Sequence, residues 1–203
     1  MLVIGLTGGI GTGKSEAARY IVSLGADLID ADVVGHEAYR PHAEAWRQVV
    51  EAFGEGILGP ENEIDRRALG SIVFSDAEQM ARLNGIMHPL MAGMVQERIE
   101  ALGERGAEVV VVEAALLFEA GWDSLVQEVW VTDSPVEAVL ERLAQRNGMS
   151  EEEARRRIAS QMSREERLER ADFVIDNSED VESMRKAIDE LWATRVKERI
   201  EQT

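Results

Sequence analysis

Cysteine is absent from the 203-residue sequence, and its absence removes several classes of function. Without thiols the chain forms no disulfide framework, no cysteine-based metal site and no thiol nucleophile. Long apolar runs are missing too, because none approaches the roughly 20 residues of a membrane-spanning helix. The apolar start MLVIGLTGGIG is short, lacks a basic flank and leads into glycines, unlike a signal peptide. We therefore expect a soluble, cytoplasmic protein with no membrane partner.

Basic residues are also few. Lys and Arg number 22 against 39 Asp and Glu, which gives a net charge of −17. A nucleic-acid-binding protein needs a basic face, so we expect no nucleic-acid partner. Eight arginines and six acids nevertheless fall between positions 142 and 170, so this segment carries +2 (8 − 6). It is interpreted as an arginine-rich lid that closes over phosphates. The alternative is a pair of solvated helices with i,i+4 pairs: Glu151–Arg155, Glu152–Arg156 and Glu153–Arg157.

Short apolar segments alternate with helical patterns along the chain. Five of them are predicted to be strands: Leu2–Thr7, Asp27–Asp30, Val109–Val112, Val129–Thr132 and Phe173–Asp176. The four successive valines indicate a strand buried on both faces, as in a parallel sheet. The alternation predicts an α/β fold with right-handed crossovers. Ser134 is predicted to N-cap a helix that starts at Pro135, and Asp180 to about Arg199 to form a final amphipathic helix.

A complete phosphate-loop motif follows the first predicted strand. Its residues are Gly8-Gly9-Ile10-Gly11-Thr12-Gly13-Lys14-Ser15, which satisfy G-x-x-x-x-G-K-[ST] between a strand and a helix. Backbone N–H groups from Gly9, Gly11, Thr12 and Gly13 can surround phosphate oxygens. Lys14 is placed to reach the β- and γ-phosphates and the Ser15 hydroxyl to ligate Mg²⁺. The motif predicts ATP and Mg²⁺ as ligands; the alternative is a glycine-rich turn that binds nothing.

A GTPase is the first competing interpretation, since Asp32-Val33-Val34-Gly35 matches D-x-x-G. A GTPase also needs an N/T-K-x-D motif. The lysines are Lys14, Lys186 and Lys197, preceded by Gly13, Arg185 and Val196. Guanine recognition therefore has no visible basis in the sequence.

Acidic residues end two of the predicted strands. Asp30 ends the second strand and Asp32 follows it, at the edge where open parallel sheets bind ligands. One of them could accept the proton of an attacking hydroxyl; the alternative is that they cap the next helix. Glu113, which ends the valine strand, is either a Walker-B-like acid that orients a Mg²⁺-bound water or a surface charge.

Several blocks, in order over nearly the whole chain, resemble the dephospho-coenzyme A kinase family. They are Gly5–Ser15, Asp30–Val34, Asn84–Pro89, Leu116–Glu119, Arg142–Arg146 and Ala171–Asn177. The resemblance implies transfer of the γ-phosphoryl group of ATP to the ribose 3′-hydroxyl of dephospho-coenzyme A, the last step of coenzyme A synthesis. Two positions depart from the family pattern: Glu16 replaces a threonine and Ala115 a proline.

The resemblance also implies roles for single residues. Asp32 would be the general base, helped by Asp30, and Arg142 would contact the transferring phosphate beside Lys14. Nucleotide-binding residues would include Glu16 through its backbone N–H, Arg146 and Asn177. The substrate-binding residues would be Thr7, Asp30, Asp32, Arg66, His88 and Leu116. From the residues alone, His88 before Pro89 is more typical of a helix boundary.

These expectations combine into a single P-loop kinase domain. A three-layer P-loop NTPase core with a five-stranded parallel sheet would span 1–32, 103–141 and 171–203. A helical substrate-binding insertion would span about 33–102 and the lid about 142–170. Dephospho-coenzyme A and ATP would be its partners, and the chain would be a monomer or a weak homo-oligomer. Another small-molecule kinase, or a regulatory ATP-binding protein, is the alternative.

Overall fold

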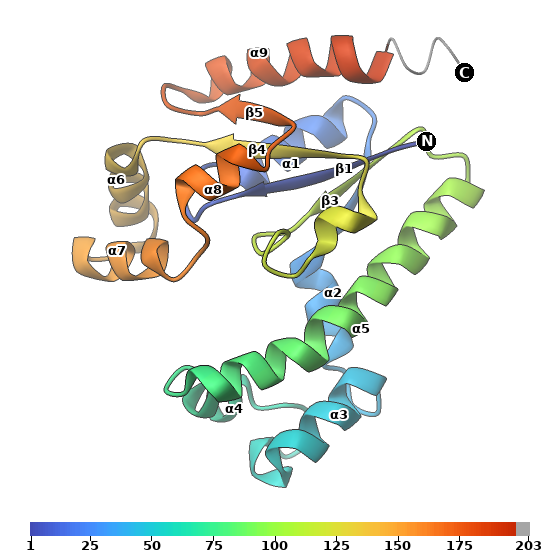
Figure 1. Ribbon diagram of the computed structural model, residues 1–203, viewed down its shortest axis with the longest axis vertical. Coiled ribbons are helices and arrows are strands. Elements are labelled where there is room, and N and C mark those ends of the chain that lie inside the picture. Colours follow the sequence, from blue (N-terminus) through green and yellow to red (C-terminus); the bar gives the residue numbers. More distant parts are fainter. Residues whose placement is uncertain (198–203) are drawn as a thin grey trace. The chain divides into compact units, whose positions relative to one another are not determined.

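A computed structural model describes residues 1–197 (Figure 1). The chain divides into two compact units. The first combines Met1–Ile29 with the chain from Ile99 onward, and the second is Asp30–Arg98. The helical insertion predicted from the sequence, about 33–102, begins and ends a few residues further along the chain than this second unit.

A five-stranded sheet forms the centre of the first unit, with the order β2-β3-β1-β4-β5. The strands are β1 Leu2–Gly8, β2 Asp27–Asp30, β3 Val109–Glu113, β4 Glu128–Asp133 and β5 Phe173–Asp176. β1 pairs in parallel with β3 and β4, and β4 pairs in parallel with β5. All five predicted strands are confirmed, as is the α/β fold class.

Both faces of the sheet are covered. Helices α1 (Lys14–Ser23) and α9 (Val181–Leu191) pack on one face, where β1, β3, β4 and β5 contribute side chains to the same cluster. On the other face, Gly5 leaves no room for a Cβ, because Leu117 and Val126 lie against it. The valines of β3 are at most 2% exposed, as the uninterrupted run predicted. Central strand β1 ends at Gly8, so the glycine loop begins at the carboxyl edge of the sheet.

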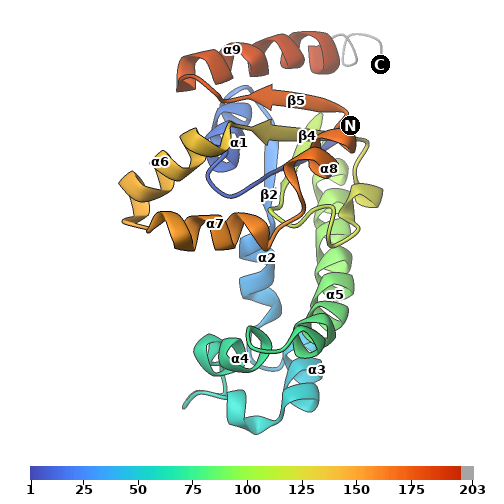
Figure 2. The same cartoon turned by 60° about the vertical axis from the view of Figure 1, so that its left-hand side comes forward.

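Further helices of the first unit follow the strands (Figure 2). They are η2 Trp122–Leu125, α6 Val136–Asn147, α7 Glu151–Ala159, α8 Arg164–Glu169 and, after α9, a π-helical turn Trp192–Lys197. The final helix was predicted to reach about Arg199, which lies outside the described residues. No helix within residues 1–197 is both long and apolar enough to cross a membrane.

The predicted cap at Ser134 is wrong. Helix α6 starts at Val136, its N-cap residue is Pro135, and no side chain caps it. Ser134 is 3% exposed, and its Oγ donates to the Asn177 carbonyl at 2.5 Å. A buried hydroxyl needs a partner, and this distant carbonyl supplies it in place of the helix end.

Helices make up most of the second unit: α2 Ala31–Ala38, α3 Glu44–Phe53, η1 Glu55–Ile57, α4 Arg66–Val73 and most of α5 Ala77–Glu104. They enclose a core that includes Val49, Ile57 and Leu69. Pro89 lies inside α5, so the predicted boundary at His88 is wrong. Leu83 and Met87 before the proline and Leu90 after it pack on the same core, and this packing carries the helix through the proline.

Candidate active site

Left-handed glycines shape the loop between β1 and α1. Gly11 has φ of 77° and Gly13, the N-cap residue of α1, has φ of 97°. Other residues adopt this conformation at a cost of about 1–2 kcal/mol. Gly13 also has no space for a side chain, because a Cβ there would lie 2.2 Å from Asn177 Nδ2. The glycines therefore expose backbone to a ligand and allow close packing behind the loop.

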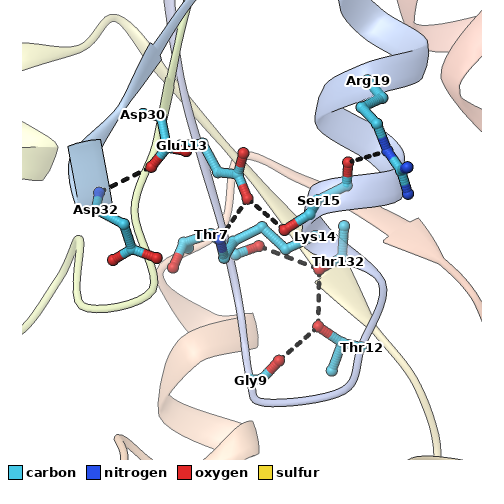
Figure 3. A network of polar contacts seen from close by, with 10 residues as sticks. All are labelled: Thr7, Gly9, Thr12, Lys14, Ser15, Arg19, Asp30, Asp32, Glu113 and Thr132. Carbon is cyan, nitrogen blue, oxygen red and sulfur yellow. Dashed lines mark hydrogen bonds and ion pairs between the residues drawn. The ribbon is translucent and has the colours of Figure 1, made fainter. Parts of the chain in front are cut away.

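Buried polar side chains form hydrogen bonds that stabilise this loop (Figure 3). Thr12 Oγ1 donates to the Gly9 carbonyl at 2.8 Å and lies 2.8 Å from Thr132 Oγ1. Asn177, just after β5, donates from Nδ2 to the Thr12 carbonyl at 2.8 Å. Thr12 and Asn177 are each 6% exposed. Since neighbouring parallel strands end at this edge, residues far apart in sequence hold the loop in one conformation.

Glu113 connects the two reactive side chains of the loop (Figure 3). Its Oε1 accepts hydrogen bonds from Lys14 Nζ at 2.6 Å and from Ser15 Oγ at 2.7 Å. Glu113 is 7% exposed, so the interpretation as a surface charge is wrong. A single carboxylate oxygen thus neutralises the lysine and orients the hydroxyl.

A cavity of about 640 Å³ opens over the loop. Most of the predicted nucleotide-binding residues line this cavity: Gly9, Gly11, Gly13, Lys14, Ser15, Glu16, Arg142, Arg146 and Asn177. Arg19, Ala115, Gln161 and residues 179–181 also line it. The Glu16 carboxylate pairs with Arg19 and Arg185, and the Glu16 N–H is donated to the Gly13 carbonyl at 3.0 Å. This N–H is therefore engaged in the first turn of α1, where the sequence analysis expected it to meet phosphate.

Arginines of the predicted lid fall into separate groups. Arg142 donates to Ser134 Oγ at 2.8 Å and to the Asn177 carbonyl at 2.7 Å, which fixes its guanidinium at the wall of the cavity. Arg164 forms two hydrogen bonds with Asp133, and this contact raises its pKa. The three predicted i,i+4 pairs on α7 are confirmed as exposed ion pairs.

Two residues of the first unit escaped the sequence analysis. Gln161 accepts a hydrogen bond from the Ile10 backbone N–H at 2.9 Å. Arg167 is 6% exposed beside Gly9, and burial lowers its pKa. Both also line a second cavity of about 350 Å³, whose apolar lining includes Ile10, Val139 and Ile158. No local pattern signals either residue, because each lies beside a loop residue, Ile10 or Gly9, that is more than 150 positions away in sequence.

The second unit carries the candidates for the acceptor side. Asp30 is the N-cap residue of α2 and accepts from the Asp32 N–H at 2.8 Å, so the capping interpretation holds for Asp30 (Figure 3). Asp32 is exposed in the first turn of that helix. His36 Nδ1 lies 2.6 Å from the Asp32 carbonyl, and its Nε2 lies 2.8 Å from Arg66 Nη1. The Arg66 guanidinium lies over the Tyr39 ring at 5.6 Å.

The remaining substrate candidates differ in exposure. Thr7 is 1% exposed, and its Oγ1 has no hydrogen-bond partner among residues 1–197. Leu116, in contrast, is 42% exposed. His88 is half-buried on α5 in the second unit.

Comparison with known proteins identifies the family. The family model for dephospho-CoA kinase matches residues 2–183. The dephospho-CoA kinase of Geobacter sulfurreducens is 46% identical over 195 residues, covering 96% of this chain and 99% of that protein. The chain belongs to the dephospho-CoA kinase family. A dephospho-CoA kinase structure from Campylobacter jejuni matches with a TM-score of 0.73 at 31% identity, over 97% of this chain and 98% of the other. The structure of TT1252 from Thermus thermophilus matches with a TM-score of 0.80 at 32% identity, over 96% and 97%.

Membership of the dephospho-CoA kinase family confirms the predicted enzyme class. The chain is a kinase of coenzyme A biosynthesis, and the interpretations as a GTPase or as a regulatory binding protein are wrong. The matches extend over both units, and the relatives are covered almost from end to end.

Proposed function

We propose that the cavity over the phosphate loop binds Mg·ATP and that its terminal phosphoryl group passes to the ribose 3′-hydroxyl of dephospho-CoA. The products are coenzyme A and ADP. The observation that carries this proposal is the hydrogen bonding of Lys14 and Ser15 to one oxygen of the buried Glu113, at the mouth of a rigid glycine loop. Phosphoryl transfer depends mainly on positioning and charge neutralisation, and this arrangement is built for both.

Nucleotide binding follows from the loop and its supports. The glycine backbone and the N-terminus of α1 surround the β-phosphate, and Lys14 turns from Glu113 to the β- and γ-phosphates. Arg142 and Arg146 line the same cavity and add positive charge beside the phosphates. Asn177 contributes indirectly, because its side-chain amide donates to the Thr12 carbonyl and so stabilises the loop.

Magnesium suits the donor set at Ser15 and Glu113. No group of three metal-binding side chains occurs within residues 1–197, and Mg²⁺ in nucleotide sites commonly takes only one or two protein ligands besides phosphates and waters. Ser15 Oγ would hold the ion, and Glu113 would accept hydrogen bonds from its waters. When bound, Mg²⁺ neutralises charge that develops on the phosphate oxygens.

The residues that we propose to act on the acceptor belong to the helical unit. Asp32 is exposed, and its carboxylate is left to accept the proton of the 3′-hydroxyl as this oxygen attacks phosphorus. Asp30 fixes the turn that carries Asp32. Arg66 is held by His36 and Tyr39 and offers a cation to the diphosphate of the acceptor.

A coupled ADP-release assay tests the proposal, with Mg·ATP and dephospho-CoA offered beside a panel of nucleosides and nucleotides. We expect saturable turnover with dephospho-CoA alone. Turnover with another panel member would remove the acceptor assignment and keep the kinase. The Asp32→Asn variant should lose about 10³-fold in kcat while its Kd for ATP stays within twofold of the unmodified chain. Normal turnover of this variant would remove Asp32 as the base.

A further inference from the structure

Gln161 occupies an unusual position between the lid and the phosphate loop. It belongs to the segment 160–163 that connects α7 with α8 (Figure 2). Its side chain lines both the cavity over the loop and the smaller apolar cavity. It is the only glutamine that does so among residues 1–197.

The hydrogen bond to the loop fixes the orientation of the Gln161 amide. The Ile10 N–H can only donate, so the group 2.9 Å away from it must be the side-chain oxygen, Oε1. The NH₂ group then points away from the Ile10 nitrogen. Nε2 donates to none of the residues that the structure describes. Two N–H donors are thus available beside the phosphate loop.

Two hydrogen bonds hold the connecting segment in place. Arg167 donates from Nη2 to the Met162 carbonyl at 2.9 Å, and the Met162 N–H donates to Glu119 Oε1 at 3.1 Å. A Cβ on Gly9 would lie 3.2 Å from Arg167 Nη1, so this glycine leaves room for the Arg167 guanidinium beside the loop. These hydrogen bonds position the segment that carries Gln161.

The same contacts indicate which end of the cavity Gln161 faces. Glu119 and Ala115 follow β3, whose last residue, Glu113, binds Lys14. Gln161, Ala115 and Lys14 all line the cavity over the loop. Lys14 is expected to contact the β- and γ-phosphates of a bound nucleotide. Asn177 and residues 179–181, which follow β5 in the chain, also line this cavity.

We propose that the Gln161 amide donates through Nε2 to the terminal phosphoryl group of ATP while Oε1 remains on the Ile10 N–H. In the transition state of transfer, charge spreads over the equatorial phosphoryl oxygens, and a fixed neutral donor stabilises that charge. The inference rests on the proposed function, since it requires ATP in this cavity. It assigns to a glutamine of the lid a contact that ADP does not make.

Two substitutions separate this role from simple support of the loop. Gln161→Ala removes both the acceptor and the donors, whereas Gln161→Glu keeps the acceptor for Ile10 and replaces the donors with negative charge. Gln145→Ala is the matched control, because Gln145 is an exposed glutamine on α6 bonded to Glu141. The measurements are kcat at saturating substrates, and Kd by calorimetry for ADP and for an ATP analogue with a non-transferable terminal phosphate.

We expect Gln161→Ala to lower kcat about 10²-fold, as for loss of one transition-state donor. It should weaken the analogue about 10-fold and ADP less than twofold. Gln161→Glu should be worse than alanine in both respects, and Gln145→Ala should match the unmodified chain. Near-normal activity of Gln161→Glu would overturn the proposal in favour of support through Oε1, as would equal weakening of ADP and the analogue. Failure of the unmodified chain to bind the analogue would overturn the proposed function as well.

Discussion

Side chains around the phosphate loop are held far more firmly than those proposed to act on the acceptor. Thr12, Glu113 and Asn177 are at most 7% exposed, and each contacts two or more partners. Asp32 and Arg66 are exposed and lie in first turns of short helices. The proposed nucleotide site is therefore preformed, whereas we expect the acceptor to order part of its proposed site on binding.

This difference predicts the largest effect for Gly13→Ala. The new side chain would combine a left-handed backbone with a contact of 2.2 Å to Asn177 Nδ2. We expect the free energy of unfolding to fall by about 3 kcal/mol and ADP binding to be lost, measured by denaturant titration and calorimetry. Gly106→Ala is the control, because its φ is +84° but no atom lies within 4 Å of the new Cβ. It should cost only about 1–2 kcal/mol, and an equal loss in both variants would mean that Asn177 yields easily.

Glu113→Gln tests the preformed site in a second way. The substitution leaves Lys14 without its carboxylate, so the protein should lose about 3 kcal/mol of stability, and kcat should fall about 10²-fold. Without Mg²⁺, however, ATP should bind at least as tightly as before, because Glu113 no longer competes with phosphate for Lys14.

Glu128→Gln is the matched control for Glu113→Gln. Glu128 is also buried, at 6% exposed, and pairs with Arg195 at 2.6 Å, but it does not line the cavity. Its substitution should lower stability and leave kcat unchanged. A drop in kcat for both variants would attribute the loss to stability alone.

The sequence predicted those parts of the fold whose causes are local. The valines of β3 and the i,i+4 ion pairs of α7 depend on residues that are close together in the sequence. Ser134 was misjudged because Asn177, 43 positions later, takes its hydroxyl. Pro89 was misjudged because packing on the helical core outweighs one missing hydrogen bond.

The residues of the candidate site also divide into those that a local motif predicts and those that depend on distant contacts. The loop residues are contiguous, so a motif finds them, and Lys14 and Ser15 needed no tertiary information. Gln161 and Arg167 reach the loop only because the chain folds back over about 150 residues. No spacing rule describes such a contact, and only the structure distinguishes Arg167 from the exposed arginines around it.

Arg66→Ala tests the helical unit with a smaller expected effect. Arg66 is exposed, so its removal should leave stability within about 0.5 kcal/mol. KM for dephospho-CoA should rise about 10-fold, as for loss of one charge-assisted contact, while KM for ATP stays unchanged. Arg67→Ala is the control, since Arg67 is the next residue of α4 and is also exposed. Equal effects of both variants would indicate general attraction of an anion.

The smallest effect is expected for His36→Ala. The Asp32 carbonyl can only accept, so His36 Nδ1 carries the proton and Nε2 accepts from Arg66. Removing the imidazole should free the Arg66 guanidinium and raise KM for dephospho-CoA about threefold, as for one neutral hydrogen bond. If His36 acts only by orienting Arg66, the substitution should have no further effect in the Arg66→Ala background. A threefold rise that persists in the double variant would mean that His36 contacts the acceptor itself, and that the helical unit holds its ligand with two independent groups.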